Sequence, residues 1–488
     1  MARIAERLGR LMGGEEPMGI RPVAAERRAL GTLDFSVLWF DLSVGLLVLV
    51  TGALLVPALG LGAALAAIAV GTLIGCVPLA LVALAGQREG VPTMVLFRPV
   101  LGARGSLAPS ALNVVQLVGW TAVEFWAMGE VASVASRRLF GFGGRTFWIA
   151  AVAVVCTALA AGGPVIVVRR WLERFGIWVL LGSAAWITVV TLRAGELGSL
   201  GNAPATGGMP FWLAVDLVIV MPVSWLPLAA DYSRFARTDA RAALGTYVGY
   251  AAGNAWFYAL GAMLVLATGV VATPVGIGAA VVALAGGGVV LLALLVGESD
   301  NAFADIYSAA VSTQNIAPRA RQRAVVVAVG AIAFALALGF SAERFELFLF
   351  LIGSVFVPLA AVFLADYLVR RRGRLGEDAL FEPSGVRWLA FVPWVVGFIV
   401  YHWCVPTGPS GWVEAVTRAF DALGLPFPLL GSRLGATVPS FAVAFLLTLV
   451  MPMDRSNRSA RSRVDPARPA TAAEPRRAAR PPDRRSRS

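Results

Sequence analysis

A short polar segment interrupts one of the most apolar stretches of the chain. Residues 297–305 read Gly-Glu-Ser-Asp-Asn-Ala-Phe-Ala-Asp, so three carboxylates, a hydroxyl and an amide lie within nine residues. The eight residues before them, 289–296, are all aliphatic. A carboxylate in the middle of a lipid bilayer costs about 2.5–3.5 kcal/mol, so three are tolerated only beside a cavity, a bound ion or each other. We therefore interpret this segment as a functional site inside a membrane.

Polar residues four apart share one face of a helix, and two such faces combine side chains that could bind a ligand. Asn301 and Asp305 share a face of the segment above, whereas its Ser299 and Asp300 point elsewhere. Upstream, Gln116, Trp120 and Glu124 follow one another at intervals of four. That second face combines a large aromatic ring with an amide, which donates and accepts hydrogen bonds, and a carboxylate, which accepts them.

The composition places both faces in a polytopic membrane protein. Of the 488 residues, 58% are hydrophobic and only 14% are charged, which is not the composition of a water-soluble domain of this size. The single His and the three Cys lie scattered in apolar runs. They offer no spacing for a zinc or haem site, so we expect no cofactor and no transition metal.

All 41 basic residues are Arg, and eleven of them follow Asp454 in a tail rich in Pro, Ala and Ser. We predict that residues 454–488 form a disordered cytoplasmic tail near anionic lipid headgroups. No aromatic residue or motif accompanies the charge, so we do not expect nucleic acid as a partner. The partners expected are the lipid bilayer and a small molecule.

Twelve segments are long and apolar enough to be membrane-spanning helices, which need about 20 residues each. We expect residues 273–287 to form a short connecting helix rather than a span. The predicted spans are 34–58, 62–86, 108–136, 147–166, 171–192, 211–233, 244–271, 288–316, 324–341, 346–369, 387–405 and 433–452.

The Arg distribution predicts the orientation of these spans. With twelve spans and a cytoplasmic N-terminus, 34 Arg lie in cytoplasmic segments and 7 lie outside. Positively charged loops remain on the cytoplasmic side. We therefore expect a multi-pass protein of the cell inner (plasma) membrane with both termini cytoplasmic, and residues 1–30 as an N-terminal cytoplasmic tail.

Two of the spans are interrupted near their middle. The first contains Asp41-Leu42-Ser43-Val44-Gly45, and the sixth contains Pro222 and Pro227, each of which removes a helical hydrogen bond. Such a segment is either a kinked helix or a broken one whose free backbone groups line a cavity. Interruptions five helices apart are the arrangement expected of a five-plus-five inverted repeat.

Several segments, in this order, resemble the nucleobase–cation symport family typified by cytosine and purine permeases. The resemblance runs from about residue 25 to 455. The segments are Gly90-Val91-Pro92-Thr93 with Phe97-Arg98-Pro99-Val100-Leu101-Gly102-Ala103-Arg104-Gly105, Gln116-Leu117-Val118-Gly119-Trp120, Ala230-Asp231-Tyr232-Ser233-Arg234-Phe235, Asp305-Ile306-Tyr307-Ser308-Ala309 and Phe363-Leu364-Ala365-Asp366-Tyr367-Leu368.

The resemblance implies an all-α, LeuT-type fold with broken helices 1 and 6. Its ten-helix core would be residues 31–370, with inverted repeats at about 34–192 and 211–370, followed by two peripheral helices in residues 371–453. It also implies import of a heteroaromatic base driven by Na⁺ or H⁺. Cytosine, hydroxymethylpyrimidine, purine, allantoin and hydantoin permeases all belong to this branch, so the substrate stays open, with a cytosine-like pyrimidine first.

The resemblance also implies roles for individual residues. Trp120 matches the residue on which the base stacks. Glu124 and Gln116 would hydrogen-bond its edge, and Met221 and Trp225 would close the other side. Asn301 or Asp305 matches a substrate-binding amide.

The coupling-ion site implied by the resemblance lies between spans one and eight. Ser299 and Asp300 align with hydroxyls that bind Na⁺, and backbone carbonyls from Ser43 to Gly45 would complete the site. A hard cation prefers such oxygen ligands. Asp300 replaces a hydroxyl in this pattern, and a protonatable carboxylate would equally suit H⁺. Both ions therefore remain open.

Three other functions fit less well. A LeuT-type symporter for an amino acid would need donors for an α-carboxylate, and one for hydantoin or allantoin stays an alternative. A membrane-embedded enzyme would need a nucleophile–base pair or a metal set, which one His and three scattered Cys do not supply. A channel would show a repeated pore motif. We therefore expect a monomeric transporter and no enzyme.

Overall fold

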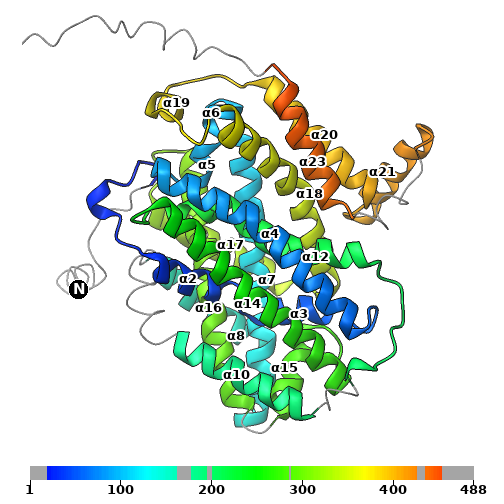
Figure 1. Ribbon diagram of the computed structural model, residues 1–488. Coiled ribbons are helices and arrows are strands. Elements are labelled where there is room, and N and C mark those ends of the chain that lie inside the picture. Colours follow the sequence, from blue (N-terminus) through cyan, green and yellow to red (C-terminus); the bar gives the residue numbers. More distant parts are fainter. Residues whose placement is uncertain (1–18, 162–176, 195–199, 285–286, 426–434, 453–488) are drawn as a thin grey trace, which may run out of the picture. The chain divides into compact units, whose positions relative to one another are not determined.

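The computed structural model describes residues 19–161, 177–194, 200–284, 287–425 and 435–452 (Figure 1). Within these ranges the regular elements are helices, and the one β-type pairing joins Leu30 to Ala236. The predicted all-α class is confirmed. The predicted tail at 454–488 and the first 18 residues of the N-terminal tail lie outside the described residues.

Helices occur in each of the twelve regions predicted to span a membrane. The short connecting helix is confirmed as α15 (Pro274–Ala283). The principal helices are α2 (Thr32–Leu42), α3 (Leu46–Ala53), α4 (Leu61–Glu89), α7 (Leu107–Phe140), α8 (Arg145–Ala160), α10 (Ile177–Ala194), α12 (Phe211–Trp225), α13 (Ala229–Ser233), α14 (Asp239–Thr268), α16 (Gly287–Ile316), α17 (Gln322–Leu338), α18 (Phe345–Leu364), α20 (Trp388–Cys404), α21 (Ser410–Ala422) and α23 (Thr437–Val450).

Length and composition alone identify fewer spans than the sequence predicts. Among the described residues, four helices are long and apolar enough to cross a membrane, and the number rises to six if each of two bent pairs counts as one span. The bent pairs are α2 with α3, at 57°, and α7 with α8, at 118°. The count of twelve therefore stays a prediction.

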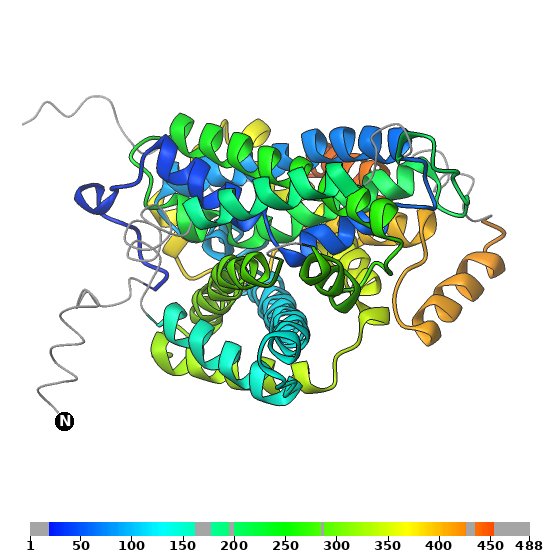
Figure 2. The ribbon, with the colours of Figure 1, turned by 90° about the horizontal axis from the view of Figure 1, so that it is seen from below.

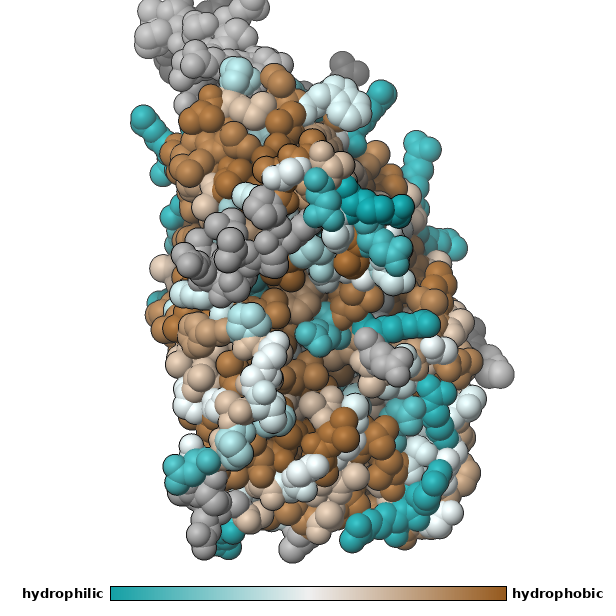
Figure 3. Space-filling model, turned by 90° about the vertical axis from the view of Figure 1, so that its right-hand side faces the viewer, coloured by the Kyte–Doolittle hydropathy of each residue, from teal (hydrophilic) through white to brown (hydrophobic). Residues whose placement is uncertain are grey.

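The surface carries many large apolar side chains, which cover much of the face in Figure 3. Val115, Val154 and Val450 are 70%, 69% and 76% exposed. A water-soluble protein of this size would not expose such extended apolar area, whereas lipid chains can cover it.

The first predicted interruption separates α2 from α3. Three residues, 43–45, lie between the two helices, and Gly45 has an extended backbone. A Cβ atom on Gly45 would lie 2.2 Å from the Glu298 carboxylate of α16. A residue with a side chain would therefore push α16 away from the interruption.

The second interruption lies slightly later than the sequence suggests. Residues Phe211–Ser233 form one helical segment, in which a 3₁₀ turn, Leu226–Leu228, joins α12 to α13. Pro227 lies in that turn, while Met221 and Pro222 lie within α12. The ring of Pro222 packs where α4 carries Gly75, since a Cβ there would lie 2.5 Å from its Cγ. The α-helical pattern therefore changes more than a turn after Met221.

The helices pack in two groups. The first consists of α2, α3, α4, α12, α13 and α14, and the second of α7, α8, α16 and α17; each packs most extensively within itself. Figure 1 shows α4 and α14 running alongside each other, and Figure 2 shows the green α14 in the upper half and the cyan α7 in the lower half. The two groups match the predicted spans 1, 2, 6 and 7 and spans 3, 4, 8 and 9.

Glycines on one face of α14 allow the first group to pack closely. Gly245, Gly249, Gly253 and Gly261 all face α2 or α3. A Cβ on Gly253 would lie 2.0 Å from the Ser43 hydroxyl. Small residues at intervals of four let membrane helices approach this closely.

The last helices and the residues before α2 pack against this core. α18, α20 and α23 contact one another, and α21 lies beyond α20 (Figure 1). Leu30 donates its N–H to the carbonyl of Phe235 at 3.0 Å, and its own carbonyl accepts from Arg237 at 2.9 Å. The chain before α2 is thereby attached to the end of α13.

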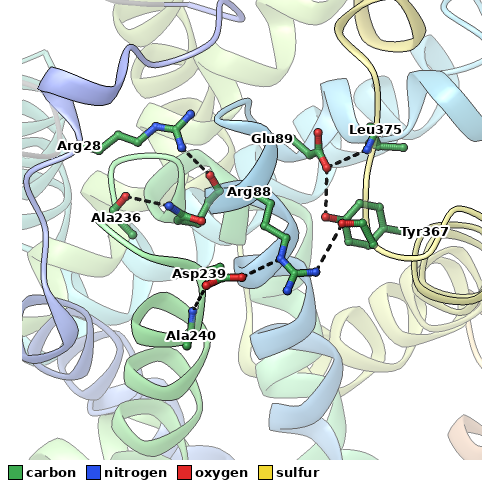
Figure 4. A network of polar contacts seen from close by, with 10 residues as sticks. Arg28, Arg88, Glu89, Ala236, Asp239, Ala240, Tyr367 and Leu375 are labelled. Carbon is green, nitrogen blue, oxygen red and sulfur yellow. Dashed lines mark hydrogen bonds and ion pairs between the residues drawn. The ribbon is translucent and has the colours of Figure 1, made fainter. Parts of the chain in front are cut away.

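A polar network joins the ends of α4 and α14 to the segment after α18 (Figure 4). Arg88 forms an ion pair with Asp239 at 2.8 Å. Glu89 accepts hydrogen bonds from the Tyr367 hydroxyl at 3.1 Å and from the Leu375 N–H at 2.9 Å. These contacts link the first helix group to the segment after α18.

Candidate functional site

The two helix groups enclose a small buried cavity. Its volume of about 20 Å³ is enough for one or two water molecules. The first group contributes α2, α3 and α12, and the second contributes α7 and α16. The lining residues are Leu42, Leu47, Val48, Trp120, Glu124, Met221, Ser224, Trp225, Glu298, Asn301 and Asp305. Six of the seven predicted substrate residues are among them.

Two indole rings form the aromatic walls of the cavity. Trp120 of α7 packs edge-on against Phe348, with ring centroids 5.3 Å apart. Trp225, at the end of α12, packs edge-on against Trp39 of α2 at 6.4 Å. Neighbouring rings therefore fix both indoles, and the N–H of Trp120 has no hydrogen-bond partner within the described chain.

Three carboxylates also line the cavity. Glu124 comes from α7, and Glu298 and Asp305 come from α16; they are 2%, 1% and 2% exposed. Each has one carboxylate oxygen without a hydrogen-bond partner among the described residues. The side-chain oxygen of Asn301 has no partner there either. A buried polar atom without a partner costs free energy, so these atoms indicate a site that is completed by a ligand or a proton.

Glu298 received no role from the sequence, and the structure gives it one. Its carboxylate accepts a hydrogen bond from the Leu46 N–H at 2.7 Å, at the N-terminus of α3. Helix N-termini attract negative charge, because their first N–H groups have no partner within the helix. Glu298 lies three residues before Asn301 and seven before Asp305, and this spacing already predicts one shared helix face.

Gln116 lies one turn away from the cavity and does not line it. Its amide N–H₂ donates to the Asn113 side-chain oxygen at 2.9 Å and to the Ser224 carbonyl at 3.1 Å. Ser224 itself lines the cavity. Gln116 thus joins α7 to α12 at the cavity wall, and its direct contact with substrate stays a prediction.

The four predicted cation-site residues do not line this cavity. The Ser43 hydroxyl donates to the Phe40 carbonyl at 2.7 Å, and the Ser299 hydroxyl to the Val296 carbonyl at 2.6 Å. Gly45 contacts Glu298 rather than these hydroxyls. The carbonyls between α2 and α3 stay the predicted ion ligands.

A second acidic pair lies beside the α2–α3 interruption. Asp41, at the end of α2, and Asp300 of α16 are 1% and 3% exposed, and their carboxylates are close enough to repel each other. The Asp41 carboxylate has no hydrogen-bond partner in the described chain. Across the described residues, no group of three His, Cys, Asp or Glu side chains is arranged to hold a metal ion.

Asp216 is a further buried acid, and its environment is structural. Its carboxylate accepts hydrogen bonds from the backbone N–H groups of Ala436 and Thr437, at 2.5 and 3.2 Å. These groups begin α23, so Asp216 of α12 caps the last described helix. No local sequence signal could identify a partner 220 residues away.

Comparison with known proteins identifies the family. Residues 22–423 match the profile of the permeases for cytosine/purines, uracil, thiamine and allantoin. The chain belongs to this family. Its members are membrane transporters, so the protein is a transporter and not an enzyme.

Individual relatives and a solved structure agree with this assignment. The hydantoin permease of Microbacterium maritypicum is 25% identical over 410 residues, which are 78% of this chain and 82% of the relative. The cytosine permease of Escherichia coli K12 is 26% identical over 324 residues, covering 65% and 73%. Mhp1, a nucleobase-cation-symport-1 family transporter solved closed with bromovinylhydantoin bound, superposes with a TM-score of 0.72 at 21% identity, covering 89% of this chain and 94% of Mhp1. The chain therefore has the fold of Mhp1.

Proposed function

We propose that the protein imports a nucleobase or related heterocycle, a cytosine-like pyrimidine first, by symport with Na⁺ or H⁺. The observation that carries the proposal is the cavity between the two helix groups, which combines two indole walls with buried hydrogen-bonding side chains. Such a cavity suits a flat ring with polar edges, since stacking holds its faces and hydrogen bonds select its edge.

The proposed topology is twelve spans in a LeuT-type arrangement, with broken helices 1 and 6 and both termini cytoplasmic. The bend of 57° between α2 and α3 and the 3₁₀ turn after α12 support the two breaks. The 34-to-7 distribution of Arg supports the orientation. The predicted location is the inner (plasma) membrane.

Alternating access would follow from movement between the two helix groups. The cavity of about 20 Å³ is too small for a heterocycle, so its walls must separate to admit one. The walls belong to different groups, and each group packs mainly within itself. Rocking of one group against the other would open the cavity to one side at a time.

Within the site, each lining residue has a proposed role. The substrate ring stacks on Trp120, and Trp225 and Met221 close the cavity from α12. Glu124 and Asp305, with Asn301, accept hydrogen bonds from its edge. Gln116 acts through its bond to Ser224, which fixes the α12 wall.

The proposed coupling ion binds between α2–α3 and α16. Ser299, Asp300 and the carbonyls from Ser43 to Gly45 would hold Na⁺, or Asp300 would carry H⁺. Either cation would neutralise part of the repulsion between Asp300 and Asp41. Ion binding would also draw α16 toward the α2–α3 interruption and so connect the two groups.

Uptake into proteoliposomes tests this proposal and identifies the ion. The purified protein is reconstituted and given labelled cytosine, hydroxymethylpyrimidine, uracil, hypoxanthine, allantoin or hydantoin, under an inward Na⁺ gradient or an inward H⁺ gradient. We expect at least one heterocycle to accumulate above its outside concentration under one of the gradients. Uptake that only equilibrates, with either gradient, would refute symport.

A further inference from the structure

Among the fully buried polar atoms of the cavity lining, unpartnered hydrogen-bond acceptors outnumber donors. Four side-chain oxygens have no partner among the described residues, against one N–H, that of Trp120. The oxygens belong to Glu124, Glu298, Asn301 and Asp305. A ligand whose N–H groups are directed at these oxygens would satisfy them.

The charges of the cavity lining also favour a ligand with N–H groups. Glu124, Asp305 and Glu298 lie close enough to repel one another, and no Arg lines the cavity. The buried Arg234 donates instead to the Gly19 carbonyl at 2.6 Å and the Tyr307 hydroxyl at 3.1 Å. Within the described chain, no cationic side chain of the cavity walls balances these carboxylates.

The backbone N–H of Leu46, which is already bound to a cavity carboxylate, does not remove this excess. Leu46 satisfies one oxygen of Glu298 and leaves the other without a partner. Because Glu298 occupies the N-terminus of α3, an anionic substrate cannot use that N–H group. A ligand with a carboxylate would add a fourth negative charge to the site.

From these observations we infer that the preferred substrate is a cationic or multiply amino-substituted heteroaromatic ring. The inference rests on the proposed function and narrows its substrate class. The amino and protonated ring N–H groups would donate to Glu124, Asp305 and Glu298. The positive charge would lie against the indoles of Trp120 and Trp225, whose faces attract cations.

This class differs from neutral oxo-substituted rings such as uracil and hydantoin. Those rings present two carbonyl oxygens, which would face carboxylate oxygens in this cavity. Placing acceptor against acceptor in a buried site disfavours such ligands strongly. An inorganic cation alone would satisfy the charge but not the aromatic walls.

The test compares ligands by direct binding to the full-length protein in lipid nanodiscs at neutral pH. The probes are thiamine, which carries an aminopyrimidine and a permanent positive charge, 2,4-diaminopyrimidine, cytosine, uracil and hydantoin. We expect thiamine or 2,4-diaminopyrimidine to bind at least tenfold more tightly than uracil or hydantoin. Uracil or hydantoin binding more tightly than both would overturn the inference and leave the proposed transport function standing.

A matched pair of variants locates the effect. Glu124→Gln replaces one carboxylate of the cavity by an amide. We expect this variant to bind the amino-substituted or cationic ligand at least tenfold more weakly. The preference of the protein for that ligand over uracil should fall as well. Glu130→Gln is the control, and it changes a carboxylate about one and a half turns further along α7. That carboxylate is already paired with Arg145 at 2.6 Å, so we expect no change in the preference for the amino-substituted or cationic ligand over uracil. An unchanged preference in Glu124→Gln would overturn the inference. If none of the five probes binds the wild-type protein, the inference fails, whereas the proposed function is decided separately by the uptake panel above.

Discussion

Replacing Trp120 by Leu removes one aromatic wall of the cavity while retaining apolar bulk. A flat ring stacked on an indole gains about 0.5–1.5 kcal/mol beyond its buried area. The predicted loss is therefore about 0.5–1.5 kcal/mol, which corresponds to an increase in Kd of about 2- to 12-fold.

The matched control is Trp126→Leu on the same helix. Trp126 is 4% exposed, similar to the 6% of Trp120, but it packs against Phe340 and does not line the cavity. Both variants remove a buried indole, so their folding losses should be similar, and only Trp120→Leu should weaken binding. Kd is measured with a labelled heterocycle bound by the wild-type protein in nanodiscs. An unchanged Kd in Trp120→Leu, or an equal loss in both variants, would refute the stacking role.

Three further substitutions test the packing and the helix ends. Gly253→Leu should prevent close packing of α14 on α2 and abolish a monodisperse peak in size-exclusion chromatography, whereas Gly62→Leu, where a Cβ meets nothing within 4 Å, should retain it. Asp216→Ala removes the cap of α23 and should lower the free energy of unfolding by about 1–2 kcal/mol, seen as a lower Tm; an unchanged Tm would contradict the cap. Arg88→Ala breaks a largely exposed ion pair and should lower the free energy of unfolding by only about 0.2–1 kcal/mol. A large drop in Tm would show that the network of Figure 4 contributes more to stability than an exposed ion pair does.

Periodicity and local spacing were sufficient to predict much of the site. The interval of four residues brought Trp120 and Glu124 to one face, and the same interval brought together Asn301 and Asp305. All four line the cavity. Glu298 belongs to the same face by its intervals of three and seven residues. Its role is not evident from the sequence, because its partner, the Leu46 N–H, becomes available only where α3 begins.

Features that depend on contacts between distant segments could not be predicted. The sequence does not show that the Gln116 amide donates to Asn113 and to the Ser224 carbonyl of α12, and its contact with substrate stays a prediction. The Ser43 hydroxyl donates to the Phe40 carbonyl of α2. Asp216 has no neighbour in sequence that explains its burial, because its partners begin the last described helix. Hydrogen-bond competition of this kind is decided by tertiary packing and leaves no periodic signal.

The most direct test of the cavity as the substrate site is an experimental structure with a bound ligand. The ligand would be the heterocycle with the lowest Kd among the probes named above. We expect its ring to lie between Trp120 and Trp225, with N–H groups directed at Glu124 or Asp305. A ligand bound outside the lining of this cavity would contradict it.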